Sequence, residues 1–534
     1  MRSSRPPRRP ETAELLQSLL AKPLQPFSVW HVKEPDLVFG GGHRAPDPKT
    51  GLRLYGPSGV NRGARGRIRL GIVGNGETID LARAWIDRCR RPVVNADPDV
   101  DPYLAVTFPG VAEADGLACD VEVESVHVRT LSPAELARCT ADDRDVAVEA
   151  TSRIIGTHLE VIKDTESPPD VVLICLPDEV KAAAGGGRRS PRRSARTTEA
   201  AATQETAGAR RRRVQNVNQL SLVFFDTPAV ANPTTPPPSL VSRTLHRAIK
   251  AEGMRQHIPT QVAWSSTFSG GPGRQDDATR AWNFWTAIFY KAFGAPWRAP
   301  ALPANTCYVG LSFFQPIAEG GRLQTSMAQA FSDGGEGMVL RGTSFPWNTR
   351  MDGPPRMPRE DAKRFLHAIV ENYRKHHGRP PARVVVHKSS YFGDEERKGL
   401  EEAIAEAGVS FADFVAVEYP SVRFFRVGKE PPIRGTVIQL ERRKHLVYTR
   451  GYVPFLKLYP GMRIPTPLLV CHEGGSGAVR DIVEELLALT RMNWNSADFC
   501  SAEPITLKFS RQIGLILSEL PSDVEVERHF KFYM

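Results

Sequence analysis

The stretch RIRLGIVGNGETIDLARAWIDRCR, Arg67 to Arg90, decides the fold class of this chain. Its first part predicts a strand that runs into a glycine-rich turn, and the remainder has the pattern of a helix. The same order returns further along, where Pro169–Pro177 and Thr260–Ser265 predict strands and Ala278–Gly294 predicts a helix. Strands that alternate with helices indicate a parallel α/β sheet.

A second α/β unit begins at Cys307. The stretch CYVGLSFF predicts a buried strand, AQAFSD and GMVLRG predict a meander, and Glu360–His376 predicts a helix with one apolar face. A further apolar strand, ARVVVHKSS, spans Ala382–Ser390, and a final helix is predicted at Ile482–Arg491. Because 534 residues exceed what one hydrophobic core normally holds, we expect two or three domains.

The formal net charge of +10 is concentrated in two segments. Residues 183–213 carry nine arginines against two glutamates, and Met1–Pro10 adds four arginines, so the rest of the chain is close to neutral. Residues 183–213 also have almost no large apolar side chain, which predicts a disordered, Arg-rich insertion loop. The overall charge is therefore weak support for nucleic-acid binding, and such a site must be argued from local residues.

The seven cysteines stand singly, with no C-x-x-C pair of the kind that binds zinc or does redox chemistry. This spacing favours buried free thiols in a reducing cytoplasm. The sequence has no run of about 18 apolar residues, and no apolar run follows the basic residues at its start. We therefore expect a cytoplasmic protein that is neither secreted nor membrane-spanning.

One set of polar residues in the first unit suits a phosphate group. His246 and Lys250 are four residues apart in a predicted helix, so they project from one face. Gln261 follows in the next predicted strand, and Lys291 lies near the end of the helix Ala278–Gly294. Two cations, an imidazole and an amide could bind a terminal phosphate through charge-assisted hydrogen bonds. Taken alone, the same residues fit ordinary surface positions more often.

The order of these residues resembles the MID domain of Argonaute proteins. The pattern is H-x-x-x-K, then T-Q with the glutamine eleven residues after the lysine, then N-x-x-x-x-x-x-x-K-x-x-G at Asn283–Gly294. LRGTSFPWNTRMDGPP, YTRGYVPFLKLYPG and LTRMNWNSADFCSAEPITLKFSRQIGLIL are similar to the PIWI half of short prokaryotic Argonautes, and EPDLVFGGGHRAPDPKTGLRLYGPSG resembles their N-terminal segment. The resemblance implies an N-terminal segment at 1–60, a Rossmann-like MID domain at 61–300 and an RNase H-like PIWI domain at 301–534.

The resemblance also implies a role for each residue of the candidate pocket. His246 occupies the position that stacks on the first guide nucleotide, while Lys250, Gln261 and Lys291 occupy positions that hold the guide 5′-phosphate. Family members often have another lysine one turn before Lys291, and here that residue is Ala287.

Two further pocket components are implied by several prokaryotic members. They are Mg²⁺ and the C-terminal carboxylate, which here belongs to Met534. Both would supplement the positive charge lost at Ala287.

The PIWI-like half lacks the acids that an active member needs. The position of the first catalytic aspartate is Ser312, and that of the second is Ser389 or its neighbour Lys388. An RNase H-like site needs carboxylates because they hold two divalent metal ions, and a hydroxyl adds no charge there. Residues near the two remaining positions are Glu360, Asp361 and the segment Asn493–Ser496. The resemblance therefore implies a catalytically inactive PIWI domain.

What remains is guided binding without cleavage. The resemblance implies a guide RNA, a single-stranded DNA target, and backbone contacts from Lys508, Ser510 and Arg511. It also implies a partner with an APAZ domain fused to a TIR, SIR2 or nuclease effector, which target recognition activates against invading plasmid or phage DNA.

Two alternatives stay open. The first is a guide-directed nuclease that recruits other acids, which predicts cleavage dependent on a divalent metal. The second is a nucleotide-binding α/β enzyme that uses the turn Gly71-x-x-Gly74-x-Gly76, although this spacing is not the G-x-G-x-x-G of dinucleotide sites.

Overall fold

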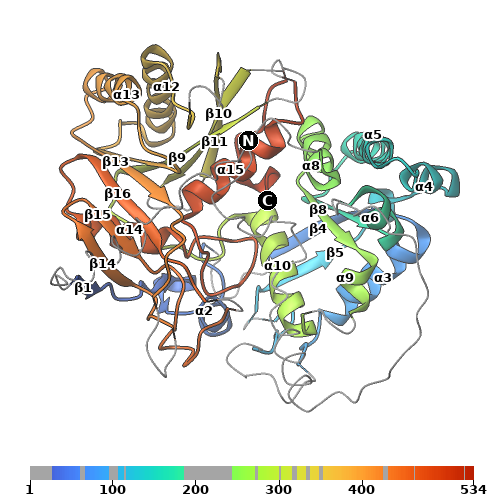
Figure 1. Ribbon diagram of the computed structural model, residues 1–534. Helices are drawn as coiled ribbons and strands as arrows, with labels where there is room; N and C mark the ends of the chain where they lie inside the picture. The colour runs from blue at the N-terminus through green and yellow to red at the C-terminus, as the bar shows by residue number, and fades with distance from the viewer. Residues whose placement is uncertain are drawn as a thin grey trace, which may run out of the picture.

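The computed structural model describes residues 27–59, 66–95, 106–113, 116–185, 243–270, 275–299, 302–315, 322–331, 337–347, 353–424, 431–461, 464–521 and 524–534. Most of the predicted insertion loop at 183–213 lies outside these residues. Two β-sheets, each covered by helices, lie side by side, and the C-terminus lies between them beside α8 (Leu245–Arg255) and α10 (Asp277–Phe293) (Figure 1).

The smaller sheet is entirely parallel. Its spatial order is β5 (Cys119–Glu122), β4 (Gly66–Gly74), β7 (Val171–Leu176) and β8 (Thr260–Trp264), with β6 (Val128–Thr130) also paired to β4. The other helices of this unit are α3 (Gly76–Arg88), α4 (Pro133–Cys139), α5 (Arg144–Lys163), α6 (Asp178–Ala184) and α9 (Ser265–Ser269).

Successive side chains of β7 point to opposite faces of this sheet, and both faces are covered by helices. Leu173 packs in the cluster that contains residues of α3 and α10, and Ile174 packs in the cluster that contains residues of α5 and α8. A strand buried on both faces has a continuous apolar sequence, which VVLICL shows. The unit is therefore a doubly wound, Rossmann-like sheet, as the sequence predicted.

The larger sheet is mixed. Its nine strands are ordered β1 (Ser28–His31), β14 (Thr436–Glu441), β15 (Lys444–Val447), β16 (Leu468–Gly475), β13 (Phe411–Glu418), β12 (Arg383–Lys388), β9 (Thr306–Phe314), β10 (Arg322–Phe331) and β11 (Gly337–Pro346). The strands β9, β10 and β11 form an antiparallel meander, while β12 is parallel to β9 and β13 is parallel to β12. This is the strand order of an RNase H-like fold, which confirms the predicted fold class.

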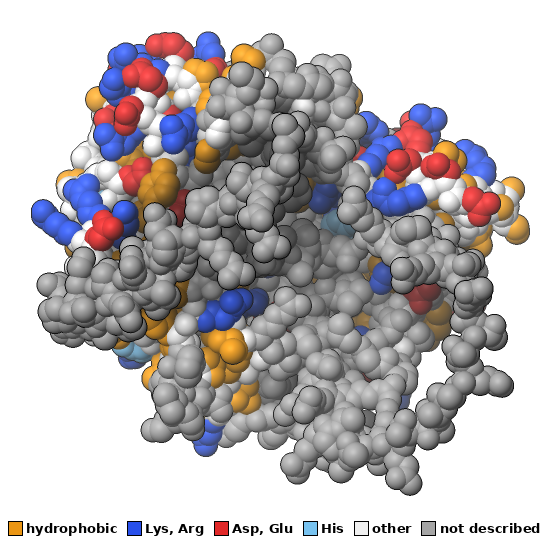
Figure 2. All heavy atoms as spheres, viewed as in Figure 1, with side chains coloured by type: hydrophobic (Ala, Val, Ile, Leu, Met, Phe, Trp, Pro, Cys, Tyr) orange, Lys and Arg blue, Asp and Glu red, His pale blue; other side chains and the backbone are white. Residues whose placement is uncertain are grey.

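Helices also cover both faces of the larger sheet. Val309 and Leu311 of β9 pack with α12 (Arg359–His377) and α13 (Asp394–Glu406), whereas Tyr308 lies in the cluster that includes α14 (Val479–Leu489) and α15 (Ile505–Leu517). The outer faces of α12 and α13 carry intermixed acidic and basic side chains (Figure 2), among them the pair Lys363–Glu406 at 2.6 Å. These charges balance one another on a solvated surface.

One glycine lets α15 approach β9 closely. A Cβ atom on Gly310 would lie 2.0 Å from the main-chain oxygen of Thr506, in the first turn of α15. A larger residue in this strand would therefore displace the helix. The sequence prediction ended its helices at Arg491 and missed α15.

The N-terminal segment is built into the larger sheet. It contributes the edge strand β1 to this sheet, and then forms a separate two-stranded sheet, β2 (Leu37–Val38) and β3 (Arg44–Ala45), followed by α2 (Pro48–Tyr55). Glu34 pairs with Arg434 at 2.6 Å and also with Arg491. Burial opposes ionisation of Glu34, but the two guanidinium groups outweigh it and hold the pKa of the carboxyl below its usual range. This ion cluster fixes the segment to the PIWI-like unit.

No helix among the described residues is long and apolar enough to cross a membrane.

Candidate nucleic-acid site

Lys250 is a buried cation at the meeting point of the two sheets. Thr244 caps the start of α8, and Lys250, in the second turn, is 1% exposed. Its Nζ donates to the main-chain oxygen of Thr260 in β8 and to that of Met534, the last residue. A helix of the smaller unit thus reaches the end of the larger one.

Lys291 approaches the same place from α10. Its Nζ donates to Gln261 Oε1 at 2.8 Å and more weakly to the Ala287 main-chain oxygen at 3.5 Å. Gln261 lies in β8 directly after Thr260, whose oxygen Lys250 binds. The structure therefore brings together Lys250, Gln261 and Lys291, as the candidate pocket requires.

His246 lies one helical turn before Lys250 on α8. Burial, together with the nearby charges of Lys250 and Lys291, lowers the pKa of its imidazole to about 3. The ring is therefore neutral near pH 7, which suits stacking rather than ion pairing.

The pocket has an excess of buried positive charge. Burial lowers the pKa of Lys291 to about 7, and burial followed by the charge of Lys291 lowers the pKa of Lys250 well below its usual value. Within the part of the chain that the structure describes, no carboxylate side chain pairs with either ammonium group. The terminal carboxylate of Met534, beside Lys250, can balance one ammonium group. Lys291 has no anionic side-chain partner among the described residues, and a buried cation without a counter-ion is costly, so an incoming anion would be favoured here.

The same pocket is a poor match for Mg²⁺. The oxygens that face the lysines, among them Gln261 Oε1 and the Met534 main-chain oxygen, already accept hydrogen bonds from the ammonium groups. Mg²⁺ needs near-octahedral oxygen coordination, and adjacent ammonium groups repel it. The pocket thus fits a phosphate better than a divalent cation, and Mg²⁺ held with the Met534 carboxylate stays a prediction of the resemblance.

The register of the larger sheet places Ser312 and Ser389 on one face. Lys388 pairs with Leu311 and His387 with Gly310 across β12 and β9. Because side chains alternate along a strand, Ser312 faces away from Leu311, and Ser389, one residue beyond β12, continues the face of His387. That face is covered by α15, since His387 Nδ1 lies 2.9 Å from Thr506 Oγ1.

Lys388 lies on the opposite face and has a packing role. Its Nζ pairs with Glu396 Oε2 at 2.6 Å, and both side chains are buried. The ammonium also lies 5.3 Å from the ring centre of Phe313 and 5.4 Å from that of Phe392. Of the two residues predicted for the second aspartate position, Ser389 is the one that shares the sheet face of Ser312.

The predicted neighbours of the catalytic positions do not gather around Ser312. Asp361 pairs with Arg364 at 2.5 Å in α12, and this helix packs on the Lys388 face of the sheet. Glu360 is exposed at the start of the same helix. Across the described ranges, no three His, Cys, Asp or Glu side chains are grouped so that they could hold a metal ion.

The segment Asn493–Ser496 is held by its own contacts. Ser496 Oγ donates to Asp498 Oδ2 at 2.9 Å and lies 3.3 Å from Asn493 Nδ2. The following main-chain nitrogen, of Ala497, donates to Asn283 Oδ1 in α10 at 3.0 Å. The segment thus joins the two units beside the candidate pocket.

The three predicted backbone contacts differ in accessibility. The Arg511 side chain is 49% exposed and pairs with Glu503 at 2.5 Å. Lys508 is half-buried, and burial lowers the pKa of its ammonium to about 8. Ser510 is fully buried, with Oγ donating to the Leu507 main-chain oxygen at 3.1 Å, so it cannot reach a nucleic acid.

The glycines near the end of β4 serve the packing of strand and helix. Gly71 and Gly74 lie within β4, and a Cβ on Gly74 would lie 2.6 Å from the Cys175 main-chain oxygen in β7. Only Asn75 separates β4 from α3, and its side chain accepts from the Thr78 nitrogen at 3.1 Å. The turn is a capped junction between strand and helix, not a glycine-rich loop around a pyrophosphate.

The resemblance placed the Met534 carboxylate in the pocket, and Lys250 donates to a Met534 oxygen. Sequence reasoning missed the main-chain oxygen of Thr260, which carries no side-chain signature. It also missed Arg243, which links Glu149 of α5 to Glu519 after α15 and so joins the two units.

Solved structures share this architecture. Clostridium butyricum Argonaute bound to a guide DNA and a 19-mer target DNA matches with a TM-score of 0.59 and 15% identity over 95% of this chain and 55% of that chain. Aa-Ago with externally bound siRNA matches with a TM-score of 0.55 and 13% identity, over 94% of this chain and 56% of that chain. Drosophila Piwi matches with a TM-score of 0.55 and 12% identity, over 95% of this chain and 56% of that chain.

These likenesses are structural rather than sequence-based. No protein-family model matches the chain, and no curated protein matches it in sequence. The chain spans just over half the length of each solved structure named above. The chain therefore has an Argonaute-like fold, in which a Rossmann-like unit precedes an RNase H-like unit.

Proposed function

We propose that this chain binds a guide nucleic acid by its 5′-phosphate and senses a complementary target without cutting it. The observation that carries the proposal is that two lysines, both 1% exposed, meet neighbouring residues of β8: Lys291 donates to Gln261 and Lys250 to the Thr260 oxygen. A phosphate would supply the counter-charge that the buried ammonium group of Lys291 lacks among its described partners.

The structural neighbours support a nucleic-acid ligand. C. butyricum Argonaute is bound to a guide DNA and a target DNA, and Aa-Ago has an externally bound siRNA. The resemblance to short prokaryotic Argonautes further favours a guide RNA and a single-stranded DNA target. In this function, base pairing supplies sequence specificity, while the protein contacts the backbone and the shape of the duplex.

The absence of cleavage is part of the proposal. Ser312 and Ser389 share the sheet face covered by α15, so two hydroxyls replace two carboxylates there. Neutral side chains do not offset the charge of two divalent ions. The effector activity would then come from an APAZ-domain partner that carries a TIR, SIR2 or nuclease effector. This effector would act against invading DNA once a target is bound.

The first experiment extracts nucleic acid from the purified chain, alone and co-expressed with an APAZ-domain protein. The extract is end-labelled with and without prior phosphatase treatment and digested with RNase or DNase. Short 5′-phosphorylated RNA is the expected product. An absence of bound nucleic acid in both preparations would contradict the proposal.

A paired variant then tests the pocket itself. Lys250→Met combined with Lys291→Met removes both charges while keeping most of the side-chain volume, and guide retention should fall at least about tenfold. Lys398→Met is the control, because Lys398 is an exposed lysine of α13 paired with Glu395 at 2.7 Å. Equal retention in both variants would show that the 5′-phosphate binds elsewhere.

A further inference from the structure

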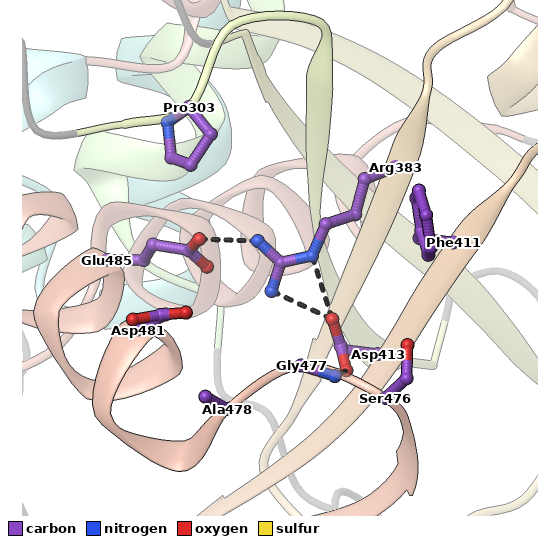
Figure 3. A pocket seen from close by; sticks show the side chains of 9 residues that line it. All are labelled: Pro303, Arg383, Phe411, Asp413, Ser476, Gly477, Ala478, Asp481 and Glu485. Atoms are coloured by element: carbon purple, nitrogen blue, oxygen red, sulfur yellow. Dashed lines mark hydrogen bonds and ion pairs between the residues drawn. The ribbon is translucent and has the colours of Figure 1, made fainter.

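A second pocket lies at the opposite end of β12 from Ser389. It has a volume of about 350 Å³ and is lined by Pro303, Arg383, Phe411, Asp413, Ser476, Gly477, Ala478, Asp481 and Glu485 (Figure 3). Arg383 begins β12 and Lys388 ends it. At about 3.3 Å per residue, the pocket is therefore roughly 15–20 Å from the edge that carries Ser389.

The one cation in the lining is already neutralised. Arg383 reaches from β12 between two carboxylates, pairing with Asp413 at 2.8 Å and with Glu485 on α14 (Figure 3). Asp413 also accepts from the Gly477 nitrogen at 2.9 Å, just before α14, and contacts His472 Nε2 at 2.9 Å. The guanidinium thus already has two carboxylate partners, so it offers little to a further anion.

Negative charge is left over on the α14 side. Glu485 is 3% exposed, and its Oε2 has no hydrogen-bond partner among the described residues, although the Tyr308 hydroxyl is close enough to influence the carboxylate. Asp481 lies one helical turn earlier and forms no ion pair within the described ranges. Figure 3 shows both carboxylates on the pocket side of α14.

We propose that this pocket binds the guanidinium group of an arginine side chain from a partner protein. A planar guanidinium can donate to Glu485 Oε2 and to Asp481 together, whereas an ammonium is a point charge. The exposed Phe411 and Pro303 at the rim give the methylene stem an apolar surface. A nucleic acid is excluded as the occupant, because acidic lining repels phosphates.

The pocket is separate from guide binding. The 5′-phosphate site lies at the junction of α8, α10 and β8, while this pocket lies between β12, β13 and α14. A partner held here would contact neither the guide pocket nor the end of β9 that carries Ser312. The site therefore fits a protein that stays attached while the chain binds nucleic acid.

The test uses the full chain and the peptide acetyl-Gly-Arg-Gly-amide, with the neutral citrulline analogue as the ligand control. Binding is followed by saturation-transfer NMR on the arginine methylene protons. Asp481→Lys should abolish binding, because the new ammonium repels the ligand and can occupy its place. Glu484→Lys changes net charge equally on an exposed neighbour outside the lining, so it should bind the peptide as the wild type does.

The milder variant Asp481→Asn should weaken binding by about fivefold, the range of one partly exposed ion pair. Equal binding by the Asp481→Lys and Glu484→Lys proteins, equal binding of the citrulline peptide, or no binding by the wild type would each overturn the proposal. Binding seen only after the arginines of residues 188–213 are replaced by glutamine would show that the chain fills its own pocket, and would overturn the assignment to a partner.

Discussion

Lys291 makes the pocket sensitive to pH. Its pKa is lowered to about 7 in the folded chain by burial, from a usual value of 10.5, so unfolding takes up a proton between these pH values. In the empty protein this contributes stability that grows as the pH rises from about 7 to about 10. Phosphate binding needs the charged form, so it should weaken over the same interval.

We expect the affinity for a 5′-phosphorylated oligonucleotide to fall by up to about tenfold per pH unit above pH 7. The phosphate is fully charged there, because its second pKa is about 6. Lys291→Met should remove most of this dependence of affinity on pH. The affinity for a 5′-hydroxyl oligonucleotide should not change with pH over the same interval. Affinity that is constant or rises with pH in the wild type would contradict the assignment.

Ser312 gives a second prediction at the residue scale. Ser312→Asp alone should not produce target cleavage with Mg²⁺ or Mn²⁺, because one carboxylate cannot hold two metal ions and Ser389 adds no charge. The measurement is cleavage of a labelled target by guide-loaded protein, with an active nuclease as the positive control. Cleavage by the single variant would show that the other ligands are already present.

At the scale of elements, the contact between β9 and α15 depends on Gly310. Gly310→Ala would place a Cβ 2.0 Å from the Thr506 main-chain oxygen, so helix or strand must move. We expect a loss of about 2–3 kcal/mol in the free energy of unfolding, measured with urea. Gly76→Ala is the control, since a Cβ there meets nothing within 4 Å and should be neutral or slightly stabilising. Similar losses in both would place the strain elsewhere.

The helix α15 also shows where sequence reasoning reached its limit. Buried strands such as β7 and β9 were predictable, because short, continuous apolar runs rich in β-branched and aromatic residues are typical of strands covered on both faces. In α15, Thr506, Ser510 and Gly514 are buried with the apolar residues, so small polar and glycine residues interrupt the apolar face, and Lys508, Arg511 and Gln512 form only a narrow polar face. The side-chain candidates for the pocket and the Met534 carboxylate came from the resemblance, whereas the main-chain oxygen of Thr260 has no side-chain signature and only the fold brings it to Lys250.

At the scale of the whole molecule, the two units meet around the candidate phosphate pocket. Tyr290 of α10 stacks on Trp494 with ring centres 5.1 Å apart, and Arg243 reaches Glu519 at 2.6 Å. These contacts lie between the helices that carry Lys250 and Lys291 and the segments that flank α15. A guide end bound at this junction would contact both units, so binding should stabilise their arrangement.

The positions of the charged residues allow recognition of the 5′-phosphate to be distinguished from binding of any oligonucleotide. Residues 188–213 contain nine arginines and two glutamates, while the two lysines that would read the phosphate are buried at the junction of the units. Deleting 188–213 should lower affinity for any oligonucleotide at low salt and flatten its salt dependence, by about 0.7 in slope for each backbone phosphate released. The preference for a 5′-phosphate over a 5′-hydroxyl should survive this deletion.

The Lys250→Met, Lys291→Met protein should behave in the opposite way, keeping the salt dependence of its affinity and losing the preference for a 5′-phosphate. Titrations at several salt concentrations with both oligonucleotides distinguish these cases, and a preference that disappears with residues 188–213 would move the phosphate site from the buried lysines to the arginines.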